Sequence, residues 1–347
     1  MITDHSATRE WLQHVMNTYR RSDPGIVEKT IMALTLLEQL ATENLQFVFK
    51  GGTSLILLLQ RFNRFSLDID ILLRQRPTDL EKSFDRICER GVFKTWFEDS
   101  RKVTNVPKAH FGFVRESVID QKERAVFVDI LFQEIEGISL IEMPVKHAVV
   151  QTASPDIFVT VPTVDWLLGD KLTAFAPNTT GIPYNVGKET EIIKQLFDIG
   201  VLFDNLTHID TVYASFTENC PREMGYRKLS TSNEVILDDC LNTAMTIVFR
   251  GTDHREHFQK LMRGIRGFRA FTFDNNYSLE NAICSSAKVV YLTQLLKHRQ
   301  TTVKRFSDSK DAQDLMISDP ALNKLNKIKK TDPEAFFYLF DAVEMLR

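Results

Sequence analysis

Residues 47–73 constrain the fold more than any other stretch, because they join a glycine pair to two acids set in an apolar run. LQFVFK ends at the glycine pair 51–52, which predicts a strand that stops in a tight turn. Thr53 and Ser54 can cap a short buried helix over 54–62. FSLDIDILL then returns to a period of two. The stretch predicts strand, turn, helix and strand.

Asp68 and Asp70 stand two residues apart in this second predicted strand, so the pleat directs both carboxylates to one face. Two such charges about 5 Å apart repel by about 3 kcal/mol at an effective dielectric near 20, which calls for a cation or a raised pKa. A divalent metal is the simplest remedy, and a solvated edge strand is the alternative. Asp129, in AVFVDILFQ, is the candidate third carboxylate, with the same alternative. These three aspartates are therefore the candidate ligands of a metal site, and the solvated edge strand stays open as the alternative.

The rest of the N-terminal half mixes helix and strand patterns. Apolar residues at helical spacing over 26–41 follow the capping residues 22–24. A capping box at 78–81 predicts a helix to about residue 90. HFGFVRESV and ERAVFVDILFQE flank a polar turn at 120–122, which predicts a hairpin, and HAVVQ and IFVTV are candidate edge strands.

The second half is helical in pattern. Five segments scan as helices: VDWLLGDKLTAFA, ETEIIKQLFDIGVLFDNL, NEVILDDCLNTAMTIVF, SLENAICSSAKVVYLTQLLKH and PEAFFYLFDAVEML. We therefore predict an α/β domain with a mixed sheet flanked by helices over residues 1–160, followed by a mostly α-helical domain over 161–347.

Composition and motifs exclude several classes. With 43% hydrophobic and 26% charged residues the chain is typical of globular proteins. It has no apolar run of the ~18–20 residues that cross a bilayer and no signal-peptide pattern, so we expect a cytoplasmic protein without a membrane partner. The four cysteines form no CxxC pair, which predicts free thiols. Neither a Walker A loop nor a dinucleotide-binding glycine motif is present.

A glycine turn before a helix offers backbone N–H groups to phosphates, and nearby carboxylates offer oxygen ligands to a metal. A nucleoside triphosphate (NTP) with Mg²⁺ would fit both the glycine turn and the carboxylates. The order of glycine turn, helix, Asp-x-Asp and a later acid resembles the layout of polymerase-β-like nucleotidyltransferases.

The chain resembles the AbiEii/AbiGii family of nucleotidyltransferase-like toxins. Four motifs carry the resemblance in this order: FKGGTSL (49–55), RFSLDID (64–70), GDKLTAFAPNTTGIPY (169–184) and KQLFDIGVLFD (194–204). The resemblance implies Mg²⁺- or Mn²⁺-dependent transfer of a nucleoside monophosphate (NMP) from an NTP to an acceptor, with tRNA 3′ ends as the acceptor class. It also implies a toxin of an AbiE-like, type IV phage-defence system that pairs with a winged-helix antitoxin.

The resemblance implies a role for individual residues as well. Asp68 and Asp70 would bind the metals, and Asp129 would be a third ligand or the base for the attacking hydroxyl. Lys171 and Asp198 of the helical domain would complete the catalytic cleft. The implied nucleotide-binding residues lie in these motifs: Lys50, Gly51, Gly52, Thr53, Ser54, Arg64, Ser66, Lys171 and Lys194.

Spacing alone leaves alternatives open in the helical half. Without the resemblance, we would expect Lys171 to extend to solvent. Lys194 and Asp198, four residues apart, would form a surface ion pair. Between residues 250 and 305, 11 Lys and Arg stand against 4 Asp and Glu, which fits either an RNA-binding surface or an ordinary solvated one. Three aromatic residues there could stack on bases: Phe268, Phe271 and Phe273. The histidine pair at 254 and 257 we interpret as surface residues.

Other functions also stay open. The enzyme could modify a small molecule such as an aminoglycoside, or a protein side chain. The chain could also be a nucleotide-binding protein without catalysis. A basic groove leading to Asp68 would favour RNA, and an acidic one would favour a cationic drug.

Overall fold

The computed structural model describes residues 1–19, 22–43, 45–59, 64–99 and 106–346. Their packing divides the chain into two compact units, Met1–Thr163 with Ala270–Asn276, and Val164–Arg269 with Tyr277–Arg347. The short segment Ala270–Asn276 therefore packs with the first unit although helices of the second unit flank it. The two-domain organisation predicted from the sequence, 1–160 and 161–347, stays a prediction.

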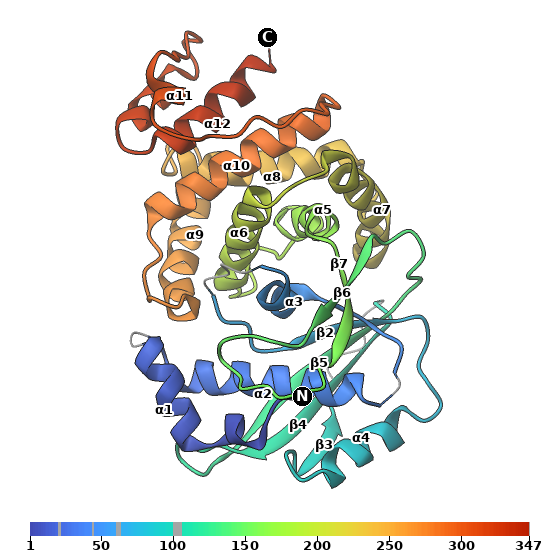
Figure 1. Ribbon diagram of the computed structural model, residues 1–347. Helices are drawn as coiled ribbons and strands as arrows, with labels where there is room; N and C mark the ends of the chain where they lie inside the picture. Colours follow the sequence, from blue (N-terminus) through green and yellow to red (C-terminus); the bar gives the residue numbers. More distant parts are fainter. Residues whose placement is uncertain (20–21, 44, 60–63, 100–105, 347) are drawn as a thin grey trace. The chain divides into compact units, whose positions relative to one another are not determined.

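The first unit is built around a mixed β-sheet (Figure 1). Within the described residues it has seven strands in the order β3-β4-β5-β2-β1-β7-β6. The strands are β1 (Val48–Lys50), β2 (Ile69–Leu73), β3 (Thr95–Glu98), β4 (Lys108–Glu116), β5 (Glu123–Phe132), β6 (Leu140–Pro144) and β7 (Phe158–Pro162). β2 runs parallel to β5 and β1 parallel to β7, whereas the other neighbours are antiparallel. The predicted mixed sheet flanked by helices is confirmed.

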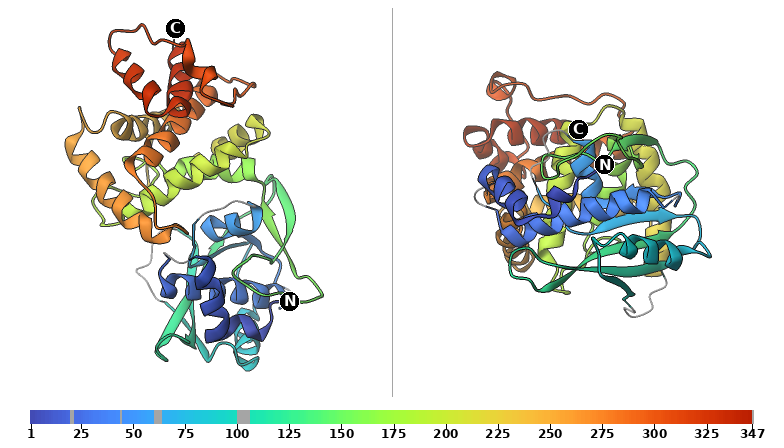
Figure 2. Two further views of the ribbon diagram at one scale, coloured as in Figure 1. Left: turned by 60° about the vertical axis from the view of Figure 1, so that its left-hand side comes forward. Right: turned by 60° about the horizontal axis from the view of Figure 1, so that its bottom comes forward.

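The two faces of the sheet differ in burial. Alternate residues of β2 and β5 point into a core that they share with α2 (Pro24–Ala41) and α4 (Leu80–Glu89). These core residues are Ile69, Ile71, Leu73, Val126, Val128 and Ile130. Figure 2 shows α2 lying along the sheet. The residues between them point to the opposite face, on which Asp70 and Asp129 are half-buried and Leu72 is buried.

The helix starts depend on which side chain reaches the free backbone N–H groups. α2 begins as predicted, because Asp23 accepts hydrogen bonds from the N–H groups of the first turn and Pro24 opens the helix. The predicted capping box at 78–81 is wrong, because α4 begins after Asp79 without a side-chain cap. Glu81, which the box requires, instead binds Arg76 at 2.6 Å.

The predicted hairpin is formed by β4 and β5, in register from Lys108↔Leu131 to Glu116↔Glu123. Its loop is held by Glu28 of α2, whose carboxylate accepts hydrogen bonds from the Ser117 hydroxyl and the Val118 N–H. The edge strand predicted for HAVVQ (147–151) is wrong, because this segment is a turn. The strand predicted for IFVTV is confirmed as β7, but β7 lies between β1 and β6 and is not an edge strand.

Helices make up the second unit. Besides α2 and α4, the described residues of the first unit form three further short helices. α10 packs against α6, α8 and α12 of the second unit (Figure 1). The helices of the second unit are α5 (Val164–Ala174), α6 (Glu189–Asp204), α7 (Ile209–Arg227), α8 (Asn233–Val248), α9 (Arg255–Phe268), α10 (Leu279–Lys297), α11 (Lys310–Gln313), η3 (Asn323–Lys330) and α12 (Pro333–Glu344). The first unit adds η1 (Asp4–Ala7), α1 (Arg9–Thr18) and α3 (Gly51–Leu58), and η2 (Arg269–Phe271) lies at the boundary. α5, α6, α8, α10 and α12 match the five predicted helices.

Two glycines of α9 mark a close helix–helix contact and do not break the helix. A Cβ on Gly264 would lie 2.4 Å from the Glu189 carbonyl oxygen, and one on Gly267 would lie 2.4 Å from Thr190 Oγ1. The start of α6 therefore approaches α9 as closely as glycine allows.

Candidate active site

The first two sequence motifs lie against each other in the first unit. The buried Thr53 hydroxyl lies 2.8 Å from Ser66 Oγ and donates to the Asp68 carbonyl oxygen at 2.5 Å. The Thr30 hydroxyl of α2 lies 3.1 Å from the Ser66 carbonyl oxygen. These contacts fix the segment before β2 against the first turn of α3.

α3 starts at the glycine pair itself, earlier than the predicted cap at Thr53 and Ser54. Lys50 precedes the helix without a side-chain cap, and the buried Ser54 hydroxyl donates to the Gly51 carbonyl oxygen at 2.8 Å. Residues 60–62 of the predicted helix lie outside the described residues. The predicted glycine turn is thus the first turn of α3.

Neither glycine position has room for a side chain, because side chains of other residues lie close to the backbone there. Gly51 has a φ of +78°, and a Cβ there would lie 2.0 Å from Asp70 Oδ2. A Cβ on Gly52 would lie 2.4 Å from the guanidinium of Arg64 and 3.1 Å from Ser66 Oγ. The structure therefore brings the glycine pair directly to three predicted site residues.

A Gly51→Ala variant is expected to destabilise the protein for two reasons. A left-handed backbone costs a residue with a side chain about 1–3 kcal/mol, and the added methyl group must displace the Asp70 carboxylate. Gly91→Ala is the matched control, because Gly91 has a φ of +86° but nothing within 4 Å of its Cβ position. Urea unfolding should show a larger loss for Gly51→Ala, and equal losses would contradict the close contact with Asp70.

The strand register aligns four polar residues, which we call the polar row. Lys50 of β1 pairs with Asp70 of β2, Asp70 with Asp129 of β5, and Asp129 with His110 of β4. Residues paired in register project to the same face, about 4.8 Å apart from strand to strand. His110 Nδ1 lies 2.7 Å from Asp129 Oδ1. The structure thus sets Asp70 beside Asp129 and adds His110, which the sequence analysis did not single out.

Asp68 lies outside β2, so it does not share a strand face with Asp70 as predicted. It is an exposed bend residue before β2, so the pleat argument does not apply to it. Its carboxylate lies 3.3 Å from Lys29 Nζ of α2. Within the part of the chain that the structure describes, no group of three His, Cys, Asp or Glu is arranged to hold a metal ion. The predicted metal site at Asp68, Asp70 and Asp129 stays a prediction.

Lys171 and Asp198 form a buried ion pair within the second unit. Lys171 Nζ on α5 lies 2.9 Å from Asp198 Oδ2 on α6, with the two side chains 8% and 0% exposed. Lys171 also donates to Gln195 Oε1 at 3.0 Å. Extension of Lys171 to solvent is therefore excluded, and the alternative of a surface ion pair fails for Asp198. Lys194 binds Glu191 at 2.8 Å.

The polar residues of the third motif have a packing role in the second unit. The carboxylate of Asp239 on α8 accepts hydrogen bonds from the Asn178 N–H, the Asn178 amide and the Thr179 hydroxyl. Tyr184 stacks on His257 at 4.3 Å, so this histidine is half covered. The motif therefore joins the end of α5 to α8.

Within the described part of the chain, six of the eleven basic residues between 250 and 305 form ion pairs with acids of the same unit. The ion pairs are Arg250–Glu280, Lys260–Glu256, Arg263–Glu189, Lys288–Asp204, Lys288–Glu334, Lys297–Asp238 and Lys304–Asp341. Phe268 is fully buried, and Phe273 packs on Phe65 at 4.4 Å. The segment therefore offers less free charge and fewer exposed rings than its sequence suggests.

The cysteines are free thiols, as predicted. Burial raises the pKa of the Cys220 thiol to about 12 and that of Cys240 well above its usual value. These two side chains stay protonated at neutral pH and are unsuited to nucleophilic attack.

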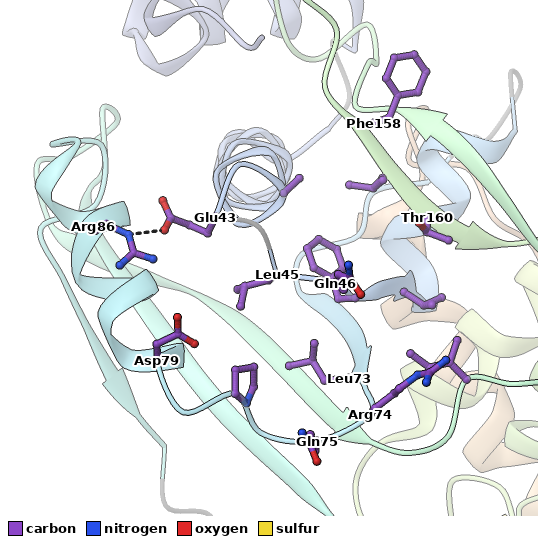
Figure 3. A pocket seen from close by; sticks show the side chains of 16 residues that line it. Glu43, Leu45, Gln46, Leu73, Arg74, Gln75, Asp79, Arg86, Phe158 and Thr160 are labelled. Carbon is purple, nitrogen blue, oxygen red and sulfur yellow. Dashed lines mark hydrogen bonds and ion pairs between the residues drawn. The ribbon is translucent and has the colours of Figure 1, made fainter.

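A cavity of about 970 Å³ lies at the other ends of β1 and β2 (Figure 3). Val48, Leu73 and Phe158 line it, and Arg86 binds Glu43 on its wall. Because β1 and β2 are antiparallel, Lys50 and Asp70 pair at the end away from this cavity. The cavity is therefore separate from the polar row.

Comparison with protein families identifies the chain as a nucleotidyltransferase. The match, over residues 35–270, is to the family described as "Nucleotidyl transferase AbiEii toxin, Type IV TA system". The chain belongs to this AbiEii family, which confirms the resemblance carried by its motifs. A toxin of this family implies an NTP substrate and an antitoxin partner. Within the described residues, no helix is both long enough and apolar enough to span a bilayer.

Two solved structures are similar to the chain. The crystal structure of JHP933 from Helicobacter pylori is 11% identical with a TM-score of 0.43, and the match covers 77% of this chain and 90% of that one. A second H. pylori structure, described as a candidate nucleotidyltransferase, is 13% identical with a TM-score of 0.43 and covers 79% and 94%. A comparison with curated proteins finds no match.

Proposed function

We propose that the protein transfers an NMP from an NTP to the 3′ end of a tRNA, with Mg²⁺ or Mn²⁺ as cofactor. We also propose that it acts in the cytoplasm as the toxin of an AbiE-like, type IV phage-defence system, with a winged-helix antitoxin as its partner. The observation that carries the enzymatic part is the contact between the glycine pair and the polar row. A ligand held at the start of α3 would meet the carboxylates of Asp70 and Asp129.

The start of α3 supports binding of the triphosphate. The first N–H groups of a helix have no partner within the helix and favour anions. Lys50 adds a positive charge at the end of β1, next to the glycine pair. We propose that Gly51, Gly52 and Thr53 bind the phosphates through their backbone. Ser54, Arg64 and Ser66, which lie in this region, are proposed to support the same site.

The carboxylates support a hard divalent cation. Mg²⁺ and Mn²⁺ prefer carboxylate oxygens, and Asp70 and Asp129 stand side by side on parallel strands. Asp68 precedes Asp70 by two residues and would be the third ligand after exchanging its contact with Lys29. Bound metal would neutralise phosphate charge and activate the acceptor hydroxyl.

The proposed reaction is an in-line substitution at the α-phosphorus. The acceptor oxygen forms a bond to this phosphorus, and the bond to the bridging oxygen of the β-phosphate breaks. Pyrophosphate leaves with the electron pair of that bond, and the hydroxyl proton passes to a base. Asp129 is the proposed base or ligand on the acceptor side. Lys171, Lys194 and Asp198 are proposed to assist from α5 and α6.

Incubation with each of the four NTPs, labelled at the α-phosphate, and total tRNA tests this function. We expect label from a preferred NTP to move to tRNA, pyrophosphate to be released, and EDTA to stop both. The control without tRNA should release no pyrophosphate. Label on a protein or a small molecule would replace tRNA as the acceptor, and no transfer to any acceptor would contradict the proposal.

A further inference from the structure

The hydrogen bond between His110 and Asp129 lies at one end of the polar row. The two residues are cross-strand partners, and their side chains are 21% and 31% exposed. An ionised carboxylate only accepts hydrogen bonds, so Nδ1 is the donor in the 2.7 Å contact with Asp129 Oδ1. Among the described residues, Asp129 Oδ2 makes no hydrogen bond.

The folding of β4 does not require this hydrogen bond. β4 and β5 are in register along the whole of β4, and the buried side chains of β4 are on the other face. These buried residues are Ala109, Phe111, Phe113 and Arg115. His110 stands on the half-buried face that carries the acids, where its removal leaves the core intact.

A carboxylate held through one oxygen has a fixed rotamer and presents its other oxygen in a fixed direction. Asp70 and Lys50 occupy the end of the row next to the glycine pair. His110 and Asp129 occupy the opposite end, on the side away from the proposed triphosphate. This end is therefore where the acceptor hydroxyl would approach.

We propose that His110 is a positioning residue, which fixes the Asp129 carboxylate so that Oδ2 is presented to the acceptor hydroxyl. This inference depends on the proposed function. His110 acts through Asp129 and does not touch the NTP.

Two substitutions separate the effect of the hydrogen bond from the effect of the imidazole ring. His110→Asn keeps a donor at the position of Nδ1, whereas His110→Leu keeps bulk without a donor. Loss of a residue that orients a site ligand typically lowers activity about 10–100-fold. We therefore expect His110→Leu to lower kcat by this factor and to leave the KM for NTP unchanged. His110→Asn should retain most of the wild-type kcat. An unchanged kcat in His110→Leu, or equal losses in both variants, would overturn the proposal.

A double-mutant cycle tests whether His110 acts through Asp129. Once Asp129→Asn has removed the carboxylate, adding His110→Leu should lower the residual rate little further. The same fold loss in both backgrounds would overturn the proposal. His14→Leu is the matched control, because His14 is exposed and stacks on Trp11, and its kcat should stay at the wild-type value.

Imidazole nitrogen NMR of the protein without substrate gives a readout apart from activity. We expect the proton of neutral His110 on Nδ1 in the wild type, and a changed distribution in Asp129→Asn. An Nε2-protonated ring in the wild type would overturn the proposal. If Asp70→Asn loses transfer while His110→Leu does not, only this inference fails; if the wild type transfers nothing or Asp70→Asn transfers normally, the proposed function fails.

Discussion

An Asp70→Asn variant is expected to lose NMP transfer by at least about 100-fold while it keeps its fold. A charge placed for the transition state is removed without a change of shape. Asp70 lies beside Asp129 on a half-buried face and against the Gly51 backbone. Two carboxylates about 5 Å apart repel by about 3 kcal/mol at an effective dielectric near 20. Removing the Asp70 charge relieves this repulsion but also takes an opposite charge away from Lys50, its other neighbour in the polar row, so we expect little net change in the free energy of unfolding.

Single-turnover transfer and urea unfolding, measured on the same preparation, check both halves of this prediction. Asp120→Asn is the control, because Asp120 is an exposed acid of the β4–β5 loop that binds Arg124. This control should transfer at the wild-type rate. Near-normal transfer by Asp70→Asn would remove Asp70 from the site, and a large loss of its stability would mean that the acid serves the fold.

Local patterns predict the strands of the site correctly, because each strand has one buried face. Period-two alternation in β2, β4 and β5 identifies these strands. It does not locate the first residue of β2, so Asp68 was assigned to a strand although it lies in the bend before it. Asp68 instead makes its contact with Lys29 of α2, which is distant in the sequence.

His110 was missed because its partner is set by the hairpin register. The polar turn at 120–122 predicts a hairpin but does not fix its register, and the observed register pairs Phe111 with Val128 and Phe113 with Val126. All four of these residues are fully buried. Matching the buried positions of the two strands restricts the register to steps of two residues, so it would have placed His110 and Asp129 on the same face but not have chosen Asp129 over residues 127 and 131 as its partner.

Two helices outside the five predicted segments show a different limit of local patterns. α7 contains Pro221 and many polar residues, and α9 contains Gly264 and Gly267. Proline and glycine normally predict breaks. In α9, however, the glycines permit the close approach of α6, so tertiary packing outweighs the local preference.

Removing either member of the buried Lys171–Asp198 pair is expected to destabilise the second unit by about 3–5 kcal/mol, because the remaining charge is left buried without its partner. Asp198→Leu and Lys171→Met should both show this loss in urea unfolding. The double variant should recover much of it, since replacing a whole buried ion pair by apolar side chains is often close to neutral. Glu218→Gln is the control, because it breaks an ion pair with Arg222 on the surface of α7 and should cost only about 0.3–0.5 kcal/mol.

The double variant also separates the structural role of this ion pair from the catalytic role that the resemblance implies for Lys171 and Asp198. Its stability reports the ion pair between α5 and α6, whereas its transfer rate reports the proposed assistance to the reaction. Recovered stability with transfer still lost would mean that the chain keeps a costly buried charge pair for catalysis, as functional sites often do. Recovery of both would assign Lys171 and Asp198 to the fold alone and contradict their proposed catalytic role. If stability is not recovered, the charges themselves are needed to join α5 to α6.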